Sequence, residues 1–167
     1  MKNKIVIILI VNALFLAGAI KPVLALEHAQ KDGLLSMDIP EEWHWMEYPQ
    51  EIIITYPDGK TMAMDIQWVP SRSIPKADIK KTIKEGNDKM IKEGIEAHHG
   101  TLIDDKEISL DGVYATRLEF KTDSQNPVDV VYLSFFNKGN ALTISYGSED
   151  EKIRSVMDDA VATLKLK

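Results

Sequence analysis

Histidine and aspartate side chains give the first candidate site of this 167-residue chain, a metal site. His98 and His99 precede Asp104 and Asp105 by a few residues, and imidazole and carboxylate are suitable ligands for a divalent metal. Adjacent residues of a helix point about 100° apart, so one helix does not easily direct both imidazoles at one ion. The histidine pair is therefore interpreted as a cationic cap near the negative end of a helix, with a metal site as the alternative.

The methionines give a second candidate, a site for a soft metal such as Cu(I). Met62 and Met64 lie two residues apart, and His44 supplies an imidazole earlier in the chain. Thioether and imidazole ligands suit copper, but the same spacing is expected of any strand that turns one face to the core. We therefore predict core packing and no bound cofactor. The candidate metal ligands remain His44, Met62, Met64, His98 and His99.

Aromatic residues form the third and most suggestive group, which consists of Trp43, Trp45, Tyr48 and Trp68. The first three lie on a connection between predicted strands, where aromatic side chains often serve binding. Together they could form a shallow apolar groove for a peptide, a lipid tail or another protein. The alternative is that Trp43 closes one end of the hydrophobic core, because tryptophan is largely buried on average. We take the four residues as the tentative binding site.

Familiar catalytic patterns are missing from the sequence. It contains no G-x-S-x-G, no H-E-x-x-H, no glycine-rich phosphate loop and no cysteine, so the common hydrolase, zinc-protease and thiol chemistries have no recognisable residues. The many carboxylates fall mostly in predicted turns and on helix surfaces. We predict that the protein is not an enzyme. The alternative is a hydrolase without a recognisable motif, because active sites are defined by geometry and not by chain order.

Residues 1–25 have the layout of a secretory signal peptide. Lys2 and Lys4 precede the apolar run Ile5–Ile20, and Val23 and Ala25 are small or aliphatic residues at the −3 and −1 positions. The run is shorter than the ~20 apolar residues of a bilayer span. We therefore expect cleavage after Ala25, a periplasmic or secreted protein, and no stable membrane insertion after cleavage. A retained membrane anchor is the alternative.

Residues 26–167 are predicted to form one acidic domain. Residues 1–25 hold three of the 20 basic residues and no acidic residue, so 17 basic and 26 acidic residues remain and give a net charge of −9. Such a charge repels phosphate backbones and anionic lipid surfaces, which argues against nucleic-acid binding. The length suits a single hydrophobic core.

Seven strands and two helices are predicted from the hydrophobic pattern. Alternating apolar residues indicate strands over Leu34–Ile39, Glu51–Tyr56, Thr61–Val69, Thr101–Leu110, Val113–Phe120, Val128–Phe136 and Ala141–Tyr146. Helical spacing of apolar residues indicates one helix over Lys76–His98 and another after Ser148. Ser148 and Glu151 have the spacing of a capping box at the start of that second helix. Glu27–Asp32 is expected to be a polar lead, and Glu41–Gln50 an irregular connection.

Two strands have predictable places in the sheet. Val128–Phe136 is apolar at both alternating sets of positions, which is typical of a strand in the middle of a sheet with a layer on each side. The two predicted helices are the candidates for those layers. Thr101–Leu110 is expected at an edge, because charged residues at positions 104–106 interrupt its apolar pattern and charges guard sheet edges.

This order of elements, together with the run GLLSMDIPEEW from Gly33 to Trp43, resembles the PsbP-like superfamily. That superfamily includes the lumenal PsbP subunit of photosystem II, a Ran-binding nuclear import factor and DcrB-type exported bacterial proteins. The resemblance implies an α+β fold, in which an antiparallel sheet of about six to seven strands is flanked by two main helices as an α-β-α sandwich. It also implies a protein that binds partners and lacks catalytic activity.

We therefore expect an exported, non-enzymatic PsbP-like domain that binds or supports a protein partner in the cell envelope. The alternative is a carrier of a small ligand or a metal that uses the surface of tryptophan, methionine and histidine residues described above. The unrecognised hydrolase is the third possibility. The sequence leaves the partner and the oligomeric state open.

Overall fold

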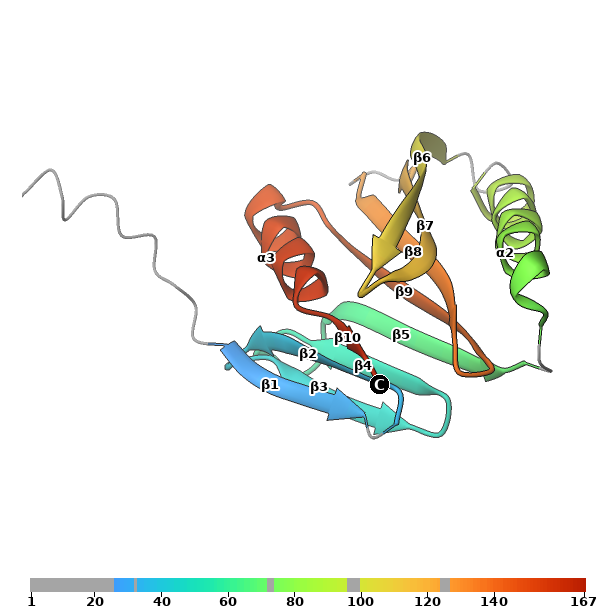
Figure 1. The fold of residues 1–167 in the computed structure, drawn as a ribbon. Helices are drawn as coiled ribbons and strands as arrows, with labels where there is room; N and C mark the ends of the chain where they lie inside the picture. Colours follow the sequence, from blue (N-terminus) through green and yellow to red (C-terminus); the bar gives the residue numbers. More distant parts are fainter. Residues whose placement is uncertain (1–25, 32, 72–73, 96–99, 124–126) are drawn as a thin grey trace, which may run out of the picture.

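The computed structural model describes residues 26–31, 33–71, 74–95, 100–123 and 127–167 (Figure 1). Three strands form a small sheet: β1 (Leu26–Lys31), β2 (Leu35–Pro40) and β10 (Lys165–Leu166). Seven strands form a large sheet: β3 (His44–Tyr48), β4 (Glu51–Thr55), β5 (Met62–Pro70), β6 (Thr101–Leu110), β7 (Val113–Lys121), β8 (Asp129–Asn137) and β9 (Asn140–Ser148). The helices are α2 (Lys76–Lys89), the π-helical segment η1 (Met90–Ile95) and α3 (Glu151–Ala162).

The large sheet separates two layers. Its strands follow the order β3-β4-β5-β9-β8-β7-β6, and neighbouring strands are antiparallel. Helix α2 lies on one side, where it contacts β7 and β8, whereas α3 and the small sheet lie on the other side (Figure 1). The predicted α+β class, the antiparallel sheet of about seven strands and the two flanking helices are thus confirmed. The small sheet was not predicted.

Strand β8 lies in the middle of the β9-β8-β7 arrangement, as its apolar pattern predicts. Its two faces are buried to different degrees. Val131, Leu133 and Phe135 are fully buried in the core, whereas Tyr132 and Phe136 on the opposite face are only half-buried. The difference arises because α2 covers β7 and β8 incompletely and leaves a groove beside them, described below.

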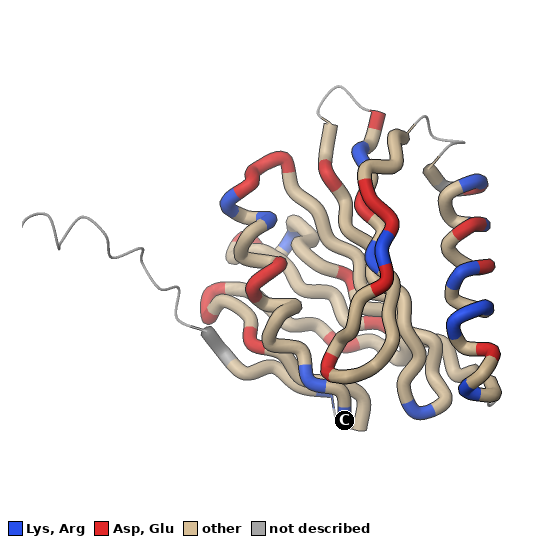
Figure 2. Tube along the Cα trace, turned by 45° about the horizontal axis from the view of Figure 1, so that its top comes forward, with Lys and Arg blue, Asp and Glu red and all other residues tan. Residues whose placement is uncertain are grey.

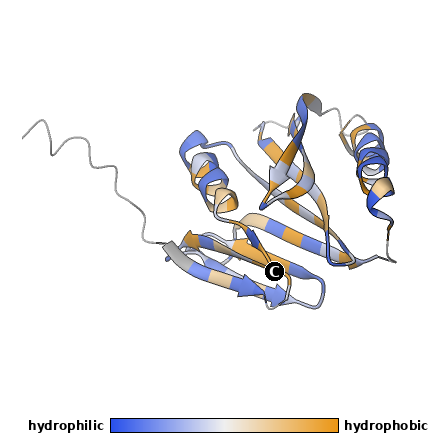
Figure 3. Ribbon diagram, viewed as in Figure 1, coloured by the Kyte–Doolittle hydropathy of each residue, from blue (hydrophilic) through white to orange (hydrophobic). Residues whose placement is uncertain are grey.

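The main hydrophobic core fills the space between the large sheet and the layer formed by α3 and the small sheet. Alternate residues of β4, β5, β8 and β9 contribute to it, and so do the inward faces of β2 and α3 (Figure 3). The predicted apolar stripe of α3 is confirmed by the burial of Met157, Ala160 and Val161. Burial of each aliphatic or aromatic side chain stabilises the fold by roughly 1.5–3 kcal/mol. Because the core contains side chains from both sheets, their burial holds the two sheets together.

Strand β6 is an edge strand, as predicted. Its pairing with β7 is interrupted between Leu102 and Asp104, and it carries a run of charged residues, in which one lysine lies among three acidic residues (Figure 2). A bulge and charged side chains both disfavour pairing with the strand of another molecule. The β6 edge is therefore protected against such pairing.

Two segments predicted to lack regular structure are strands. Strand β1 covers most of the expected polar lead at Glu27–Asp32, and β3 lies within the expected connection Glu41–Gln50. Neither segment has a clear apolar alternation of its own. Backbone pairing over the full length of β2 stabilises β1, and pairing with β4 across a two-residue turn stabilises β3. Strand propensity depends strongly on the neighbouring strands, which explains why both predictions were wrong.

The segment Lys76–His98, predicted as one helix, is helical throughout its described residues but changes type within them. Regular α2 ends at Lys89, and the chain continues as the π-helical segment η1 to Ile95. Glycine inside a helix costs about 1 kcal/mol against alanine, and Gly86 and Gly94 lie on either side of this change. Residues 96–99, and with them His98 and His99, lie outside the described residues.

The predicted capping box at Ser148 and Glu151 is wrong. Asp150 is the N-cap residue of α3, and its carboxylate accepts a hydrogen bond of 2.8 Å from the amide of Lys152. Ser148 instead ends β9, where it lies in register with Asp129, and its hydroxyl oxygen accepts a 3.0 Å hydrogen bond from the amide of Asp150.

The signal peptide predicted for residues 1–25 lies outside the described residues. Within the part of the chain that the structure describes, no helix is both long and apolar enough to span a bilayer.

Candidate functional site

Two of the four predicted aromatic residues, Trp43 and Trp45, line one pocket. This pocket, called here the tryptophan pocket, has a volume of about 400 Å³ and lies between the small sheet and strand β3. Both indole rings are half-buried. The lining residues are Ala29, Gln30, Ile39, Glu41, Trp43, His44, Trp45 and Glu47.

Local contacts fix both tryptophans. The amide of Trp43 donates a 2.9 Å hydrogen bond to the carbonyl of Pro40, and its ring meets the ring of Tyr56 edge to face, with centroids 5.1 Å apart. The indole nitrogen of Trp45 donates a 3.1 Å hydrogen bond to Glu47, which also pairs with Lys31 of β1. The hydrogen bonds from Lys31 and Trp45 lower the pKa of Glu47. The carboxylate therefore connects the small sheet to the large one.

The other two predicted aromatic residues lie elsewhere. Trp68 is buried in the main core on β5, and Tyr48 is exposed near the end of β3 and does not line the tryptophan pocket. The four residues therefore do not form one surface. The expectation that Trp43 closes the core is also partly met, because its half-buried ring packs against the core cluster.

The candidate ligands for a soft metal are separated. Met64 is 1% exposed and Met62 is 55% exposed, because a register shift beside Thr55 interrupts the alternation of β5. The prediction that both methionines share a core face is therefore wrong. His44 and Met62 are each in register with Thr55 from opposite sides, which places their backbones roughly 10 Å apart. Among the described residues, no group of three or more histidine or acidic side chains could hold a metal ion.

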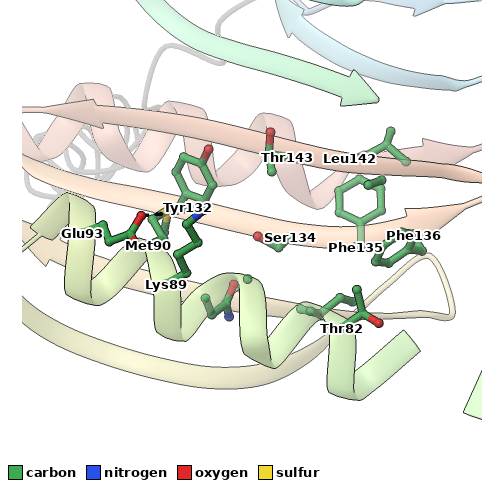
Figure 4. Close-up of a pocket in the computed structure, with 14 residues that line it drawn as sticks. Thr82, Lys89, Met90, Glu93, Tyr132, Ser134, Phe135, Phe136, Leu142 and Thr143 are labelled. Atoms are coloured by element: carbon green, nitrogen blue, oxygen red, sulfur yellow. Dashed lines mark ion pairs between the residues drawn. The ribbon is translucent and has the colours of Figure 1, made fainter. Parts of the chain in front are cut away.

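A second cavity lies between the helix α2-η1 and strands β8 and β9 (Figure 4). This cavity, the α2 groove, has a volume of about 390 Å³. A side chain at Gly86 would find no atom within 4 Å of its Cβ, so the glycine leaves the groove open. The apolar lining residues include Ile83, Met90, Phe135, Phe136, Ala141 and Leu142, and the polar ones include Thr82, Asn87, Ser134 and Thr143.

The floor of the α2 groove is held by one buried polar contact. The amide nitrogen of Asn87 donates a 2.8 Å hydrogen bond to the hydroxyl of Thr116 on β7, and both residues are buried. Lys89 and Glu93 form an ion pair of 3.7 Å at the helical rim (Figure 4). This groove was not predicted from the sequence, although the glycine in the helix and the small residues of β9 were available as a signal.

A network of charged side chains ties α3 to the large sheet. Glu119 on β7 lies 2.6 Å from Arg117 and 3.2 Å from Arg154 of α3, and Arg154 lies 2.9 Å from Asp129 of β8. Burial opposes the charge of Arg117, but the hydrogen bond to Glu119 and its negative charge outweigh burial and raise the pKa of Arg117. This network was not predicted from the sequence, because its members come from three separate elements.

Tyr146 of β9 extends this contact between α3 and the sheet. Its hydroxyl donates a 2.6 Å hydrogen bond to Asp158 of α3. Burial, this hydrogen bond and the charge of Asp158 all raise the pKa of Tyr146 above its usual value. The neutral phenol is therefore the form that the folded protein favours.

We expect the free energy of unfolding to fall as the pH rises above about 10, the ordinary pKa of tyrosine in an unfolded chain. The contribution of a group with a raised pKa is complete below its unfolded pKa and is lost as the pH rises through the folded pKa. The substitution Tyr146→Phe should reduce this alkaline slope, as measured by urea unfolding between pH 7 and pH 11. The exposed Tyr48→Phe is the matched control. An unchanged slope in Tyr146→Phe would contradict the expectation.

Among the described residues, Asp65 on β5 is a structural candidate for acid–base chemistry. Burial, followed by the charge of Glu51, raises the pKa of Asp65, and Gln67 donates hydrogen bonds to both carboxylates. A perturbed carboxyl group can mark an active site. Among the described residues, neither acid lines the tryptophan pocket or the α2 groove.

Comparison with known proteins finds similarity only at the level of structure. No protein-family model and no curated protein sequence matches the chain. The solution structure of cyanobacterial PsbP from Synechocystis matches with a TM-score of 0.66 and 12% identity, over 89% of this chain and 96% of that one. LpqN of Mycobacterium tuberculosis, described as involved in cell envelope biogenesis, matches with a TM-score of 0.51 and 15% identity, over 86% and 90% of the two chains.

A third structure, a Pseudomonas aeruginosa protein of unknown function described as a putative regulator, matches with a TM-score of 0.51 and 12% identity, over 85% of this chain and 97% of that one. The identities are low, so the matches concern the fold and not the activity. They extend over most of this chain and most of each similar structure. The chain therefore has the PsbP-like fold that its sequence resembles.

Proposed function

We propose that this protein is an exported, non-enzymatic PsbP-like module that binds a protein partner in the cell envelope. The observation that carries the proposal is the tryptophan pocket, in which two half-buried indole rings line a cavity of about 400 Å³ at the border between two sheets. Tryptophan is the residue most enriched among those that dominate binding energy at protein interfaces. The signal-like segment at residues 1–25 supports export, and the similar fold of LpqN supports a place in the envelope.

The test is a quantitative pull-down from the native envelope. The double variant Trp43→Ala/Trp45→Ala should recover a specific partner about tenfold less efficiently than the unsubstituted protein, because removal of a central aromatic side chain typically costs more than 1 kcal/mol of binding free energy. The matched control is Leu102→Ala/Ile103→Ala, which removes two exposed apolar side chains from the opposite sheet edge. A thermal unfolding curve of each variant checks the fold.

Two outcomes contradict the proposal. One is the absence of any specific partner for the unsubstituted protein in several detergents. The other is equal recovery by the folded double variant.

A second candidate function is the transport or storage of a small apolar ligand in the α2 groove. The volume of about 390 Å³ and the mainly apolar lining are typical of ligand sites. Native mass spectrometry of protein purified from its own compartment should then detect a bound mass. The substitution Gly86→Met should remove that mass by filling the groove, and Gly86→Ala is the control for helix stability. A protein without bound mass would exclude this candidate.

A further inference from the structure

The outer edge of β3, the terminal strand of the large sheet, is the place of the further inference. We propose that an extended, basic segment of the partner protein adds to β3 as an eighth strand of the large sheet and places alternate side chains in the tryptophan pocket. This inference rests on the proposed function, because it concerns the same surface. It specifies the conformation and the charge of what binds there.

The backbone of β3 is available for such pairing. Strand β3 is the last strand of the large sheet, and among the described residues only β4 pairs with it. Backbone groups alternate in direction along an antiparallel strand, so every second residue of His44–Tyr48 directs its N–H and C=O groups to the free edge. Strand addition uses these main-chain groups for affinity and pockets beside the edge for specificity.

The two edges of the large sheet differ in their protection. The β6 edge carries a register shift and a run of charged residues. Strand β3 pairs with β4 in continuous register from His44 to Tyr48, and Glu47 is its only acidic or basic residue other than His44. Natural proteins usually protect exposed edges with bulges, charges or proline. Strand β3 has no bulge and carries a single carboxylate over its five residues, so its edge is less protected than that of β6.

The tryptophan pocket gives the added strand a place for its side chains. Its apolar walls are Trp43 just before β3, Trp45 of β3, and Ala29 and Ile39 of the small sheet, and its polar lining residues are Gln30, Glu41, His44 and Glu47. Side chains of a strand alternate between its two faces. An added strand beside β3 would therefore direct every second side chain toward this pocket, where the indole rings offer apolar contact and Glu41 and Glu47 offer negative charge, and the remaining side chains away from it.

The charges around β3 favour a basic segment. Glu41 and Glu42 are exposed at the entry to β3, and neither forms an ion pair with any described residue. Glu47 of β3 pairs with Lys31, and the predicted mature chain has a net charge of −9. Complementary charge raises association rates and selects partners.

The experiment uses a phage-displayed library of random ten-residue peptides, selected against the immobilised full chain. The expected binders have apolar residues at alternate positions and lysine or arginine between them. Hydrogen exchange of the complex should slow at the amides of His44–Tyr48. N-methylation of alternate residues on the pairing edge of the peptide should weaken binding about tenfold or more, because each methyl group removes a main-chain hydrogen bond.

The protein-side variant is Glu41→Lys/Glu42→Lys, which leaves both tryptophans in place. It should weaken the basic peptides severalfold, and the control Asp105→Lys on the β6 edge should not. The inference is overturned if no binder is selected, if binders are acidic or unaffected by N-methylation, if protection appears at α2 instead, or if light scattering shows a dimer joined through β3. The proposed function is judged separately, because its pull-down depends on Trp43 and Trp45 and not on how the partner is held.

Discussion

Replacing Leu133 with alanine is expected to lower the free energy of unfolding by about 2–5 kcal/mol, the range observed for large-to-small substitutions in a close-packed core. Leu133 is 1% exposed and lies at the centre of β8, in register with Ile144 of β9. The loss combines the apolar surface that is no longer buried with the cavity that the rigid surroundings leave behind. Urea denaturation followed by circular dichroism measures it.

The matched control is Leu102→Ala on the edge strand β6. Its side chain is exposed, so the expected loss is less than about 1 kcal/mol. Similar losses at the two positions would mean that β8 does not lie in the middle of the sheet. Such a result would contradict the fold itself.

Replacing Glu119 with alanine is expected to lower the free energy of unfolding by about 2–3 kcal/mol. This carboxylate faces both Arg117 and Arg154, and removal of one partner leaves a partly buried charge without compensation. The expected loss is smaller than that for a fully buried pair, because the side chain of Arg154 is 26% exposed and keeps its contact with Asp129.

A double-mutant cycle separates the coupling from other effects of the substitution. Glu119→Ala, Arg154→Met and the combined variant should give a coupling free energy of about 1 kcal/mol or more, because the two side chains belong to one network. The control is Glu107→Ala, which removes an exposed ion pair with Lys80 and should cost about 0–1 kcal/mol. Additive effects at Glu119 and Arg154 would show that this ion pair does not contribute to holding α3 on the sheet.

The candidate site was predictable only in part. The sequence identifies Trp43 and Trp45 as neighbours, and both line the tryptophan pocket. It places Trp68 and Tyr48 in the same group, yet the first is buried in the core and the second is exposed elsewhere. Residue type and local spacing do not specify which face of the sheet is covered by another layer. That coverage depends on the small sheet, whose strand β1 has no clear apolar pattern.

The strands, too, were predictable only in part. Strand β8 was predicted because its pattern is strong over nine residues, whereas β3 and β10 were missed because each is short and depends on a neighbour. The predicted start of α3 was wrong because it, too, depends on pairing with a neighbouring strand. Ser148 continues the pairing of β9 with β8, so the cap moves to Asp150.

The sequence by itself determined the α+β class, the central and edge positions of β8 and β6, and the stripe by which α3 joins the core. These properties follow from local periodicity, which records how each segment alternates between covered and uncovered faces. Only the tertiary structure decided that a small sheet covers part of the large one, that a groove opens beside α2, and that Glu119 meets Arg154. These contacts join segments far apart in the chain, and their register is set by long-range backbone pairing, which no local pattern encodes.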